Sequence, residues 1–285
     1  MFSNPQVSNA SKARRSVAVF LEQLAQQRAV LVQVEAFEGS VPRETGAWMA
    51  VFQDQLVGTV GGGHLEYDAL AQARRMLALE PANQLAKTAR FALGPSLGQC
   101  CGGVVHLHFE PVCAADISTL AARLQPALLP VALFGGGHVG HALVQVLANL
   151  PFQMTWIDSR DGVFPALVPR GVVCEHSEPV QLAVRSLAPQ SRVLIMSFSH
   201  AEDLDIVSEC LQRQRDQLDL PYIGLIGSKT KWASFRQRLE ARGFTPQELA
   251  HVTCPIGVSG IAGKEPEVIA IAVAAQLLQS LQTRV

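Results

Sequence analysis

Hydrophobic positions along the first half of the chain recur with two periods, one typical of helices and one typical of strands. Val17, Phe20 and Leu24 fall on one face of a helix. Later, apolar and polar side chains alternate from Val105 to Phe109, as in a strand with one buried face. In this half we predict helices at residues 16–28 and 64–80, and strands at residues 30–37, 46–52, 56–60, 87–93 and 104–112.

The second half carries short apolar runs without charge. Val131 to Phe134 is such a run, and it suits a strand that is buried on both faces, as in a parallel sheet. We therefore predict an α/β protein, with an amino-terminal α/β domain at residues 1–126 and a Rossmann-type domain with a mainly parallel sheet at residues 127–285. Residues 125–130, with two prolines, are predicted to link them. The further predicted strands are residues 154–157, 172–175, 193–198 and 222–226, and the predicted helices are residues 141–149, 229–242 and 266–281.

A glycine-rich turn follows the first strand of the second half. Gly135, Gly137 and Gly140 have G-x-G-x-x-G spacing, between a predicted strand and a predicted helix, and Asp158 ends the next strand. Amides at the helix start favour a phosphate or pyrophosphate, and an acid at this distance can bond to a ribose hydroxyl. The glycines could instead serve only close packing of helix and strand. His138, inside the turn, could contact a ligand or cover the adjacent strand.

A second triple glycine stands in the first half. Gly61, Gly62 and Gly63 join a predicted strand to a predicted helix, followed by His64 and Glu66. The turn could present amides to an anion, or it could need glycine only for its geometry. Glu66 could be a ligand group, or it could interact with the helix dipole.

Adjacent cysteines stand in a glycine-rich segment of the first half. The residues around Cys100 and Cys101 are small or polar, so the thiols can be accessible and one can be activated as a nucleophile or soft-metal ligand. Adjacent cysteines cannot easily clamp one zinc ion, and two small residues in a tight turn are the plain alternative. The remaining cysteines are interpreted as packing residues: Cys113, Cys174, Cys210 and Cys254.

The carboxyl ends of the parallel strands are predicted to form a ligand crevice beside the glycine turn. The polar side chains expected at its rim are Asp158, His200, Asp203, Ser228 and Lys229. For His200 and Asp203, a helix start capped by a serine is an equally good interpretation.

Composition narrows the class of partner. The net charge of −1 gives no electrostatic reason for binding nucleic acid or an anionic membrane surface. No apolar run is long enough to span a bilayer. The six cysteines show no pairing pattern, which favours reduced thiols and a cytoplasmic location.

Several segments together resemble a known family. They are residues 39–43 (GSVPR), 58–66 (GTVGGGHLE) and 98–103 (GQCCGG), with the turn at Gly135 and residues 199–203, 226–229, 255–257 and 263–267 in the second half. These residues are similar to the XdhC–CoxI family, accessory proteins for xanthine dehydrogenase and related molybdenum hydroxylases.

The resemblance implies a chaperone rather than a classical enzyme. Such a protein binds the molybdenum cofactor, molybdopterin with its metal, and brings it to a cysteine desulfurase. It then helps to insert the cofactor into the molybdenum subunit of xanthine dehydrogenase. The resemblance assigns molybdenum or sulfur contacts to Cys100 and Cys101, places His64 and Glu66 in the site, and implies a homodimer. Either molybdopterin or a separate nucleotide could occupy the Rossmann crevice.

Two other functions remain as alternatives. The first is an NAD-dependent oxidoreductase that uses the Gly135 turn and Asp158, although no proton donor paired with a substrate-positioning arginine is evident. The second is a thiol redox protein built on Cys100 and Cys101, which lack the C-x-x-C spacing of such proteins.

Overall fold

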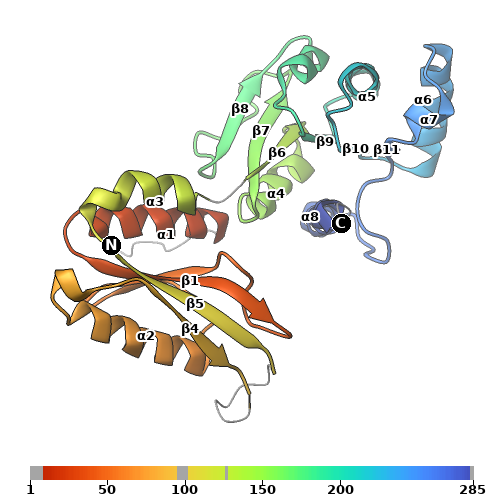
Figure 1. Cartoon of the computed structure of the whole chain (residues 1–285). Coiled ribbons are helices and arrows are strands. Elements are labelled where there is room, and N and C mark those ends of the chain that lie inside the picture. Colours follow the sequence, from red (N-terminus) through yellow and green to blue (C-terminus); the bar gives the residue numbers. More distant parts are fainter. Residues whose placement is uncertain (1–8, 95–101, 126–127, 283–285) are drawn as a thin grey trace. The chain divides into compact units, whose positions relative to one another are not determined.

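A computed structural model describes residues 9–94, 102–125 and 128–282 of the chain (Figure 1). The chain divides into two compact units. One is Ala13–Pro126, and the main body of the other is Ala127–Val285. Within the described ranges, no helix has both the length and the apolar character needed to cross a membrane.

The amino-terminal unit is built on an antiparallel sheet of five strands in the order β3-β2-β1-β5-β4. The strands are β1 (Ala29–Glu38), β2 (Trp48–Val51), β3 (Leu56–Gly58), β4 (Lys87–Ala92) and β5 (Val104–Val112), and the helices are α1 (Asn9–Leu24), α2 (Gly63–Leu77) and α3 (Ile117–Leu124).

Helices cover both faces of this sheet, α2 on one face and α1 with α3 on the other (Figure 1). The alternation in β5 explains the arrangement, because Leu107 and Phe109 are buried beneath α2 with Leu65. On the opposite face, Phe20 of α1 packs with Leu120 of α3. The sequence did not predict α3.

The carboxy-terminal unit contains a parallel sheet of six strands in the order β11-β10-β9-β6-β7-β8. This is the Rossmann order, with β6 as the first strand and a change of winding direction between β6 and β9. The strands are β6 (Leu129–Phe134), β7 (Phe152–Asp158), β8 (Val172–His176), β9 (Arg192–Ile195), β10 (Tyr222–Leu225) and β11 (Val252–Thr253). The helices are α4 (His138–Leu147), α5 (His200–Gln217), α6 (Lys229–Ala241), α7 (Pro246–Leu249) and α8 (Pro266–Gln282).

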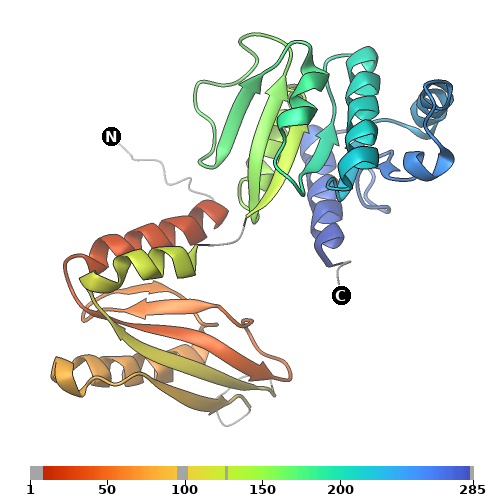
Figure 2. The ribbon, with the colours of Figure 1, turned by 45° about the horizontal axis from the view of Figure 1, so that its top comes forward.

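The two faces of the parallel sheet have separate cores. The helices α4 and α8 lie side by side on one face, where Trp156 and Leu143 are buried, and α5 packs on the other face (Figures 1 and 2). Because both faces are covered, β6 and β9 need apolar side chains on both sides, which explains their uncharged centres.

The structure confirms the predicted α/β class, with a Rossmann domain in the second half, and moves several boundaries. Strand β6 begins at Leu129, inside the segment predicted as a linker. Helix α4 begins at His138, three residues before its predicted start at His141. Strand β11 has only two residues, too few to show a period in the sequence.

Candidate functional site

The glycine turn after β6 combines close packing with one open position. A methyl group at Gly135 would lie 2.0 Å from the carbonyl oxygen of Met196, and one at Gly140 would lie 2.1 Å from the carbonyl oxygen of Gly135. A methyl group at Gly137, the N-cap of α4, would meet nothing within 4 Å. Gly135 and Gly140 therefore hold the helix against the sheet, whereas space is open at Gly137.

The start of α4 leaves amides for a ligand. The first hydrogen bond of the helix runs from the N–H of His141 to the carbonyl of Gly137, so the amides before His141 have no acceptor within the helix. His138 is exposed and does not cover the adjacent strand. Beneath the turn, the buried indole of Trp156 donates to the carbonyl of Gly135 over 2.9 Å. The turn is thus packed against Trp156 on one side and is exposed on the other side, at Gly137 and His138.

Asp158, at the end of β7, is buried and fully hydrogen-bonded. Its Oδ2 accepts from the N–H of Gly136 over 2.6 Å and from Nη2 of Arg160 over 2.9 Å. Its Oδ1 accepts from the backbone N–H and the Nε of Arg160, both over 2.9 Å. Burial acts to raise the pKa of Asp158, but the bonds from Arg160 and Gly136 outweigh it and hold the pKa below its usual range. The predicted bond to a ribose stays a prediction, and this carboxylate already has four donors within the chain.

Arg160 also contacts an exposed aromatic ring. Its guanidinium carbon lies 4.7 Å from the centroid of Phe198, which follows β9. Glu202, in the first turn of α5, accepts from the hydroxyl of Ser159 over 2.6 Å and has a buried second oxygen without a hydrogen-bond partner. The hydrogen bond to Asp158, followed by the charges of Asp158 and Glu202, raises the pKa of Arg160. The guanidinium is therefore permanently charged at this edge of the sheet.

The rim of the predicted crevice is held by an ion pair that the sequence did not reveal. Asp203 is buried and accepts from Nζ of Lys231 over 2.6 Å and from the N–H of Ser197 over 2.8 Å. Ser228 caps α6 by accepting from the N–H of Lys231, whereas Lys229 is exposed. The side chain of Lys231 therefore reaches back to the strand ends, whereas the sequence predicted Lys229 at this rim.

His200, another member of the predicted rim, lies at the start of α5. Ser199 caps this helix by accepting from the N–H of Glu202 over 3.2 Å. His200 is exposed and meets the ring of Phe235 edge-on, with the centroids 6.4 Å apart. This geometry agrees with the helix-start interpretation of the segment.

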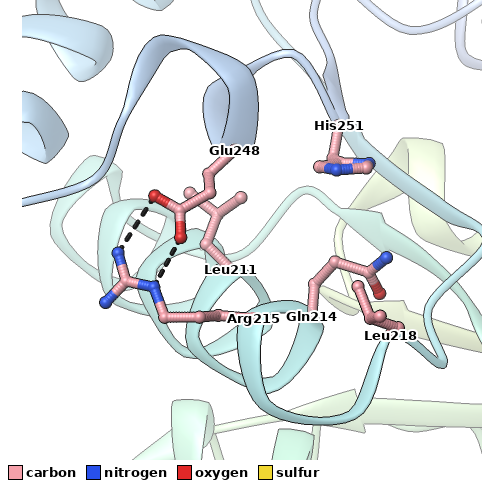
Figure 3. A pocket seen from close by; sticks show the side chains of 6 residues that line it. All are labelled: Leu211, Gln214, Arg215, Leu218, Glu248 and His251. Carbon is pink, nitrogen blue, oxygen red and sulfur yellow. Dashed lines mark hydrogen bonds and ion pairs between the residues drawn. The ribbon is translucent and has the colours of Figure 1, made fainter.

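A separate, small pocket of about 60 Å³ lies at the carboxyl end of α5, and Figure 3 shows the side chains that line it. Arg215 of α5 and Glu248 of α7 form an ion pair across it, with two bonds of 2.5 and 3.0 Å. Glu248 also accepts from Thr245, the N-cap of α7, so the pair ties α5 to α7. We therefore interpret the residues around the pocket as a structural contact between α5 and α7.

The glycine turn of the amino-terminal unit is closed by its own helix. One oxygen of Glu66 accepts from the hydroxyl of Thr59, from the N–H of Val60 over 3.3 Å and from the N–H of Gly62 over 3.2 Å. The N–H of Gly61 donates to the Thr59 hydroxyl over 3.2 Å. These amides are satisfied within the chain, and their predicted role toward a ligand stays a prediction.

The first residues of α2 are exposed. Gly63 and His64 lie at the surface, and the His64 ring is 6.0 Å from that of Tyr67, which is also exposed. His64 is thus accessible at the surface, and its predicted role in the site stays a prediction.

Three segments of the amino-terminal unit meet at one corner. A methyl group at Gly61 would lie 2.5 Å from Cγ of Pro42. A methyl group at Gly103 would lie 2.5 Å from the carbonyl oxygens of both Glu38 and Ser40. Residues 59–66 and residues 102–103 therefore each lie against residues 38–43, and we call these three segments the motif corner. Glycine is required at both contacts because a side chain would not fit.

Family models match both halves of the chain. A model described as the XdhC Rossmann domain matches residues 131–277, and a model of the XdhC and CoxI family matches residues 23–88. The chain belongs to the XdhC–CoxI family. The resemblance of its sequence segments to this family is thereby confirmed.

Known proteins resemble this XdhC–CoxI chain over most of its length. The uncharacterized protein YqeB of Escherichia coli (strain K12) is 25% identical over 252 residues, which are 87% of this chain and 43% of YqeB. The chain therefore spans less than half the length of this relative. A crystal structure of a xanthine dehydrogenase from Bacillus halodurans matches with a TM-score of 0.75 and 23% identity, over 95% of this chain and 96% of that one. This second likeness shows the fold.

The cysteines of the XdhC–CoxI chain differ in their surroundings. Cys100 and Cys101 lie outside the described residues. Burial raises the pKa of Cys254 to about 11 and also raises the pKa of Cys174 and Cys210, so these thiols stay protonated at neutral pH. Cys113 is exposed, so its interpretation as a packing residue was wrong.

No metal site is evident in the part of the chain that the structure describes. There, no three histidine, cysteine or acidic side chains are grouped so that they could hold a metal ion. The candidate sites among the described residues are therefore the glycine turn after β6, with its charged side chains, and the motif corner. The role of Cys100 and Cys101 as thiol ligands stays a prediction.

Proposed function

We propose that this chain binds the molybdenum cofactor and delivers it to the molybdenum subunit of xanthine dehydrogenase. In this proposal the chain holds the cofactor while a cysteine desulfurase supplies the terminal sulfur, and it acts as a homodimer. The observation that carries the proposal is membership of the XdhC–CoxI family, matched in both units of the chain. The chain acts as a carrier, so the cofactor is its cargo.

The motif corner supports this proposal by its chemistry. A methyl group at Gly62 or Gly102 would meet nothing within 4 Å, so backbone rather than side chain is presented there, which suits a bulky ligand that must approach closely. Cys100 and Cys101 directly precede Gly102 and Gly103 in the sequence. Thiolates are soft ligands and suit a thiophilic metal better than oxygen ligands do. We propose that these thiols contact the molybdenum or its sulfur.

The alternative of an NAD-dependent oxidoreductase has less support. It needs Asp158 to accept hydrogen bonds from a ribose diol, as acids at the end of this strand do in NAD-binding folds. Each oxygen of Asp158 already accepts two hydrogen bonds from the chain. A ribose would have to displace Arg160 from a buried carboxylate.

The direct test is the cofactor content of the purified full chain. We expect protein from cells that make the cofactor to retain molybdenum, measured by mass spectrometry, and pterin, measured by fluorescence after oxidation. Cys101→Ala and the double variant Cys100→Ala/Cys101→Ala should lower molybdenum retention about tenfold or more without changing the unfolding temperature. Cys113→Ala is the matched control, because Cys113 is an exposed cysteine of the same unit.

Two results would contradict the proposal. The first is a protein that stays empty in cells that make the cofactor while it oxidises a substrate with NAD. The second is molybdenum retention that is the same in the double cysteine variant as in the Cys113→Ala control.

A further inference from the structure

The place where a Rossmann crevice usually recognises ribose is closed in this protein. The acid at the end of the second strand, Asp158, has a side chain only 1% exposed, and its four hydrogen bonds come from Gly136 and Arg160. A ribose hydroxyl would have to donate to this carboxylate, which has no free acceptor position for it. The group that stands at this position toward solvent is the guanidinium of Arg160, which is 36% exposed.

The guanidinium lies beside the glycine turn. Nη2 of Arg160 and the N–H of Gly136 donate to the same oxygen, over 2.9 and 2.6 Å, so the two nitrogens are close neighbours. The bonds to Asp158 use Nε and Nη2 and leave both hydrogens of Nη1 for another acceptor. Phe198 supports the planar group from one side. Asp158 and Phe198 thus hold the guanidinium of Arg160 in one orientation.

We infer that Arg160 makes the Rossmann crevice specific for a ligand with a phosphate monoester, and that Asp158 serves to orient Arg160. An arginine near the end of this strand is the group that accommodates a phosphate where other Rossmann folds bind a ribose hydroxyl. A guanidinium binds phosphate through charge-assisted hydrogen bonds of fixed direction. The inference deepens the proposed function and rests on it for one source of the ligand, because molybdopterin carries a phosphate; a phosphorylated dinucleotide is the other source.

Glu202 is the nearby charge that opposes this role. It accepts a hydrogen bond from Ser159, the residue before Arg160, and its charge raises the pKa of Arg160, so it lies near the place proposed for the phosphate. Its bond to Ser159 needs only an acceptor, which a glutamine also supplies. Glu202→Gln should therefore bind a phosphate monoester more tightly than the wild type, whereas a purely structural role of Arg160 predicts no change.

The test measures binding to the full chain by calorimetry with inorganic phosphate, NADP⁺ and NAD⁺. NADP⁺ and NAD⁺ differ by one phosphate monoester, so their comparison isolates this group. We expect NADP⁺ to bind about tenfold or more tightly than NAD⁺, and we expect Arg160→Gln to abolish this preference and the binding of inorganic phosphate. Arg160→Lys should keep part of it, because it keeps the charge and loses the planar fork. Arg185→Gln is the control, since Arg185 pairs with Glu209 at the surface of the same unit.

A final comparison separates the two sources of phosphate. If molybdopterin is the source, Arg160→Gln should lose pterin during purification while Arg185→Gln keeps it. If a nucleotide is the source, Arg160→Gln should lose NADP⁺ binding and keep its pterin. The inference is overturned if NAD⁺ binds as well as NADP⁺, if none of the probes binds, or if Arg160→Gln binds them like the wild type. Loss of pterin from the cysteine variants alone concerns the proposed function and leaves this inference intact.

Discussion

The two glycine turns have the same four residues, GGGH, and differ in the origin of the acid that closes them. In the amino-terminal turn the acid is Glu66 of the following helix, and it takes the amides of Val60 and Gly62. In the second turn the acid is Asp158 of the neighbouring strand, and it accepts from the amide of Gly136 and from both the amide and the side chain of Arg160. The first turn is therefore satisfied within itself, whereas the second presents a positive charge.

The two turns also differ in the charge of the groups that surround them. The donors to Glu66 are a hydroxyl and two amides, all uncharged. At the second turn, two ion pairs lie at the strand ends, between Asp158 and Arg160 and between Asp203 and Lys231. Identical glycine sequences thus give one corner organised by backbone contacts and one edge organised by buried charge.

The largest expected effect comes from breaking the buried ion pair at the second turn. Lys231→Met should lower the free energy of unfolding by about 4 kcal/mol, because it leaves the buried Asp203 carboxylate without its charged partner. Lys229→Met, two residues away and exposed, should change it by less than about 0.5 kcal/mol. Urea unfolding of the two variants measures the difference, and equal effects would show that the edge does not depend on buried charge.

The glycines of the second turn should divide into packing and open positions. Gly140→Ala should destabilise the protein by about 3 kcal/mol, because the new methyl group would collide with the carbonyl of Gly135. Gly137→Ala should have little effect on thermal unfolding, since nothing lies within 4 Å of that position. If both variants melt like the wild type, the close contact between α4 and β6 is not as described.

The amino-terminal turn should depend on the single acceptor Glu66. Glu66→Ala should lower the free energy of unfolding by about 2 kcal/mol, because the amides of Val60 and Gly62 lose their partner. Glu66→Gln keeps a carbonyl oxygen in place and should be affected less. Chemical unfolding distinguishes the two variants, and a greater loss with glutamine than with alanine would refute the role of Glu66 as an acceptor.

The smallest effect concerns pH and the second turn. The pKa of Asp158 is lower in the folded than in the unfolded chain, so its contribution is complete above the unfolded value and is lost as the pH falls through the folded value. Asp158→Asn removes this dependence. The difference in unfolding free energy between wild type and variant should be larger at pH 7 than at pH 3, and a difference that grows at pH 3 would reverse the sign assigned to Asp158.

The sequence predicted those parts of the protein that periodicity and glycine spacing determine. The strands of both sheets and the glycine turns lie where these patterns placed them, apart from the very short β11. Side-chain direction was harder to predict, as Lys229 and Lys231 show. Side chains in the first turn of a helix lean back toward its start, and the register of α6 decides which lysine reaches Asp203. Likewise, a sequence cannot show that Arg160 folds back onto Asp158.

The most direct test of the proposed function is the position of molybdenum in crystals of the full chain loaded with the cofactor. Anomalous diffraction at the molybdenum absorption edge would locate the metal without reference to any other atom. The proposed function predicts one molybdenum site at the motif corner, within reach of Ser40, Gly61 and Gly103. A molybdenum peak elsewhere in the chain, or crystals of loaded protein without one, would contradict it.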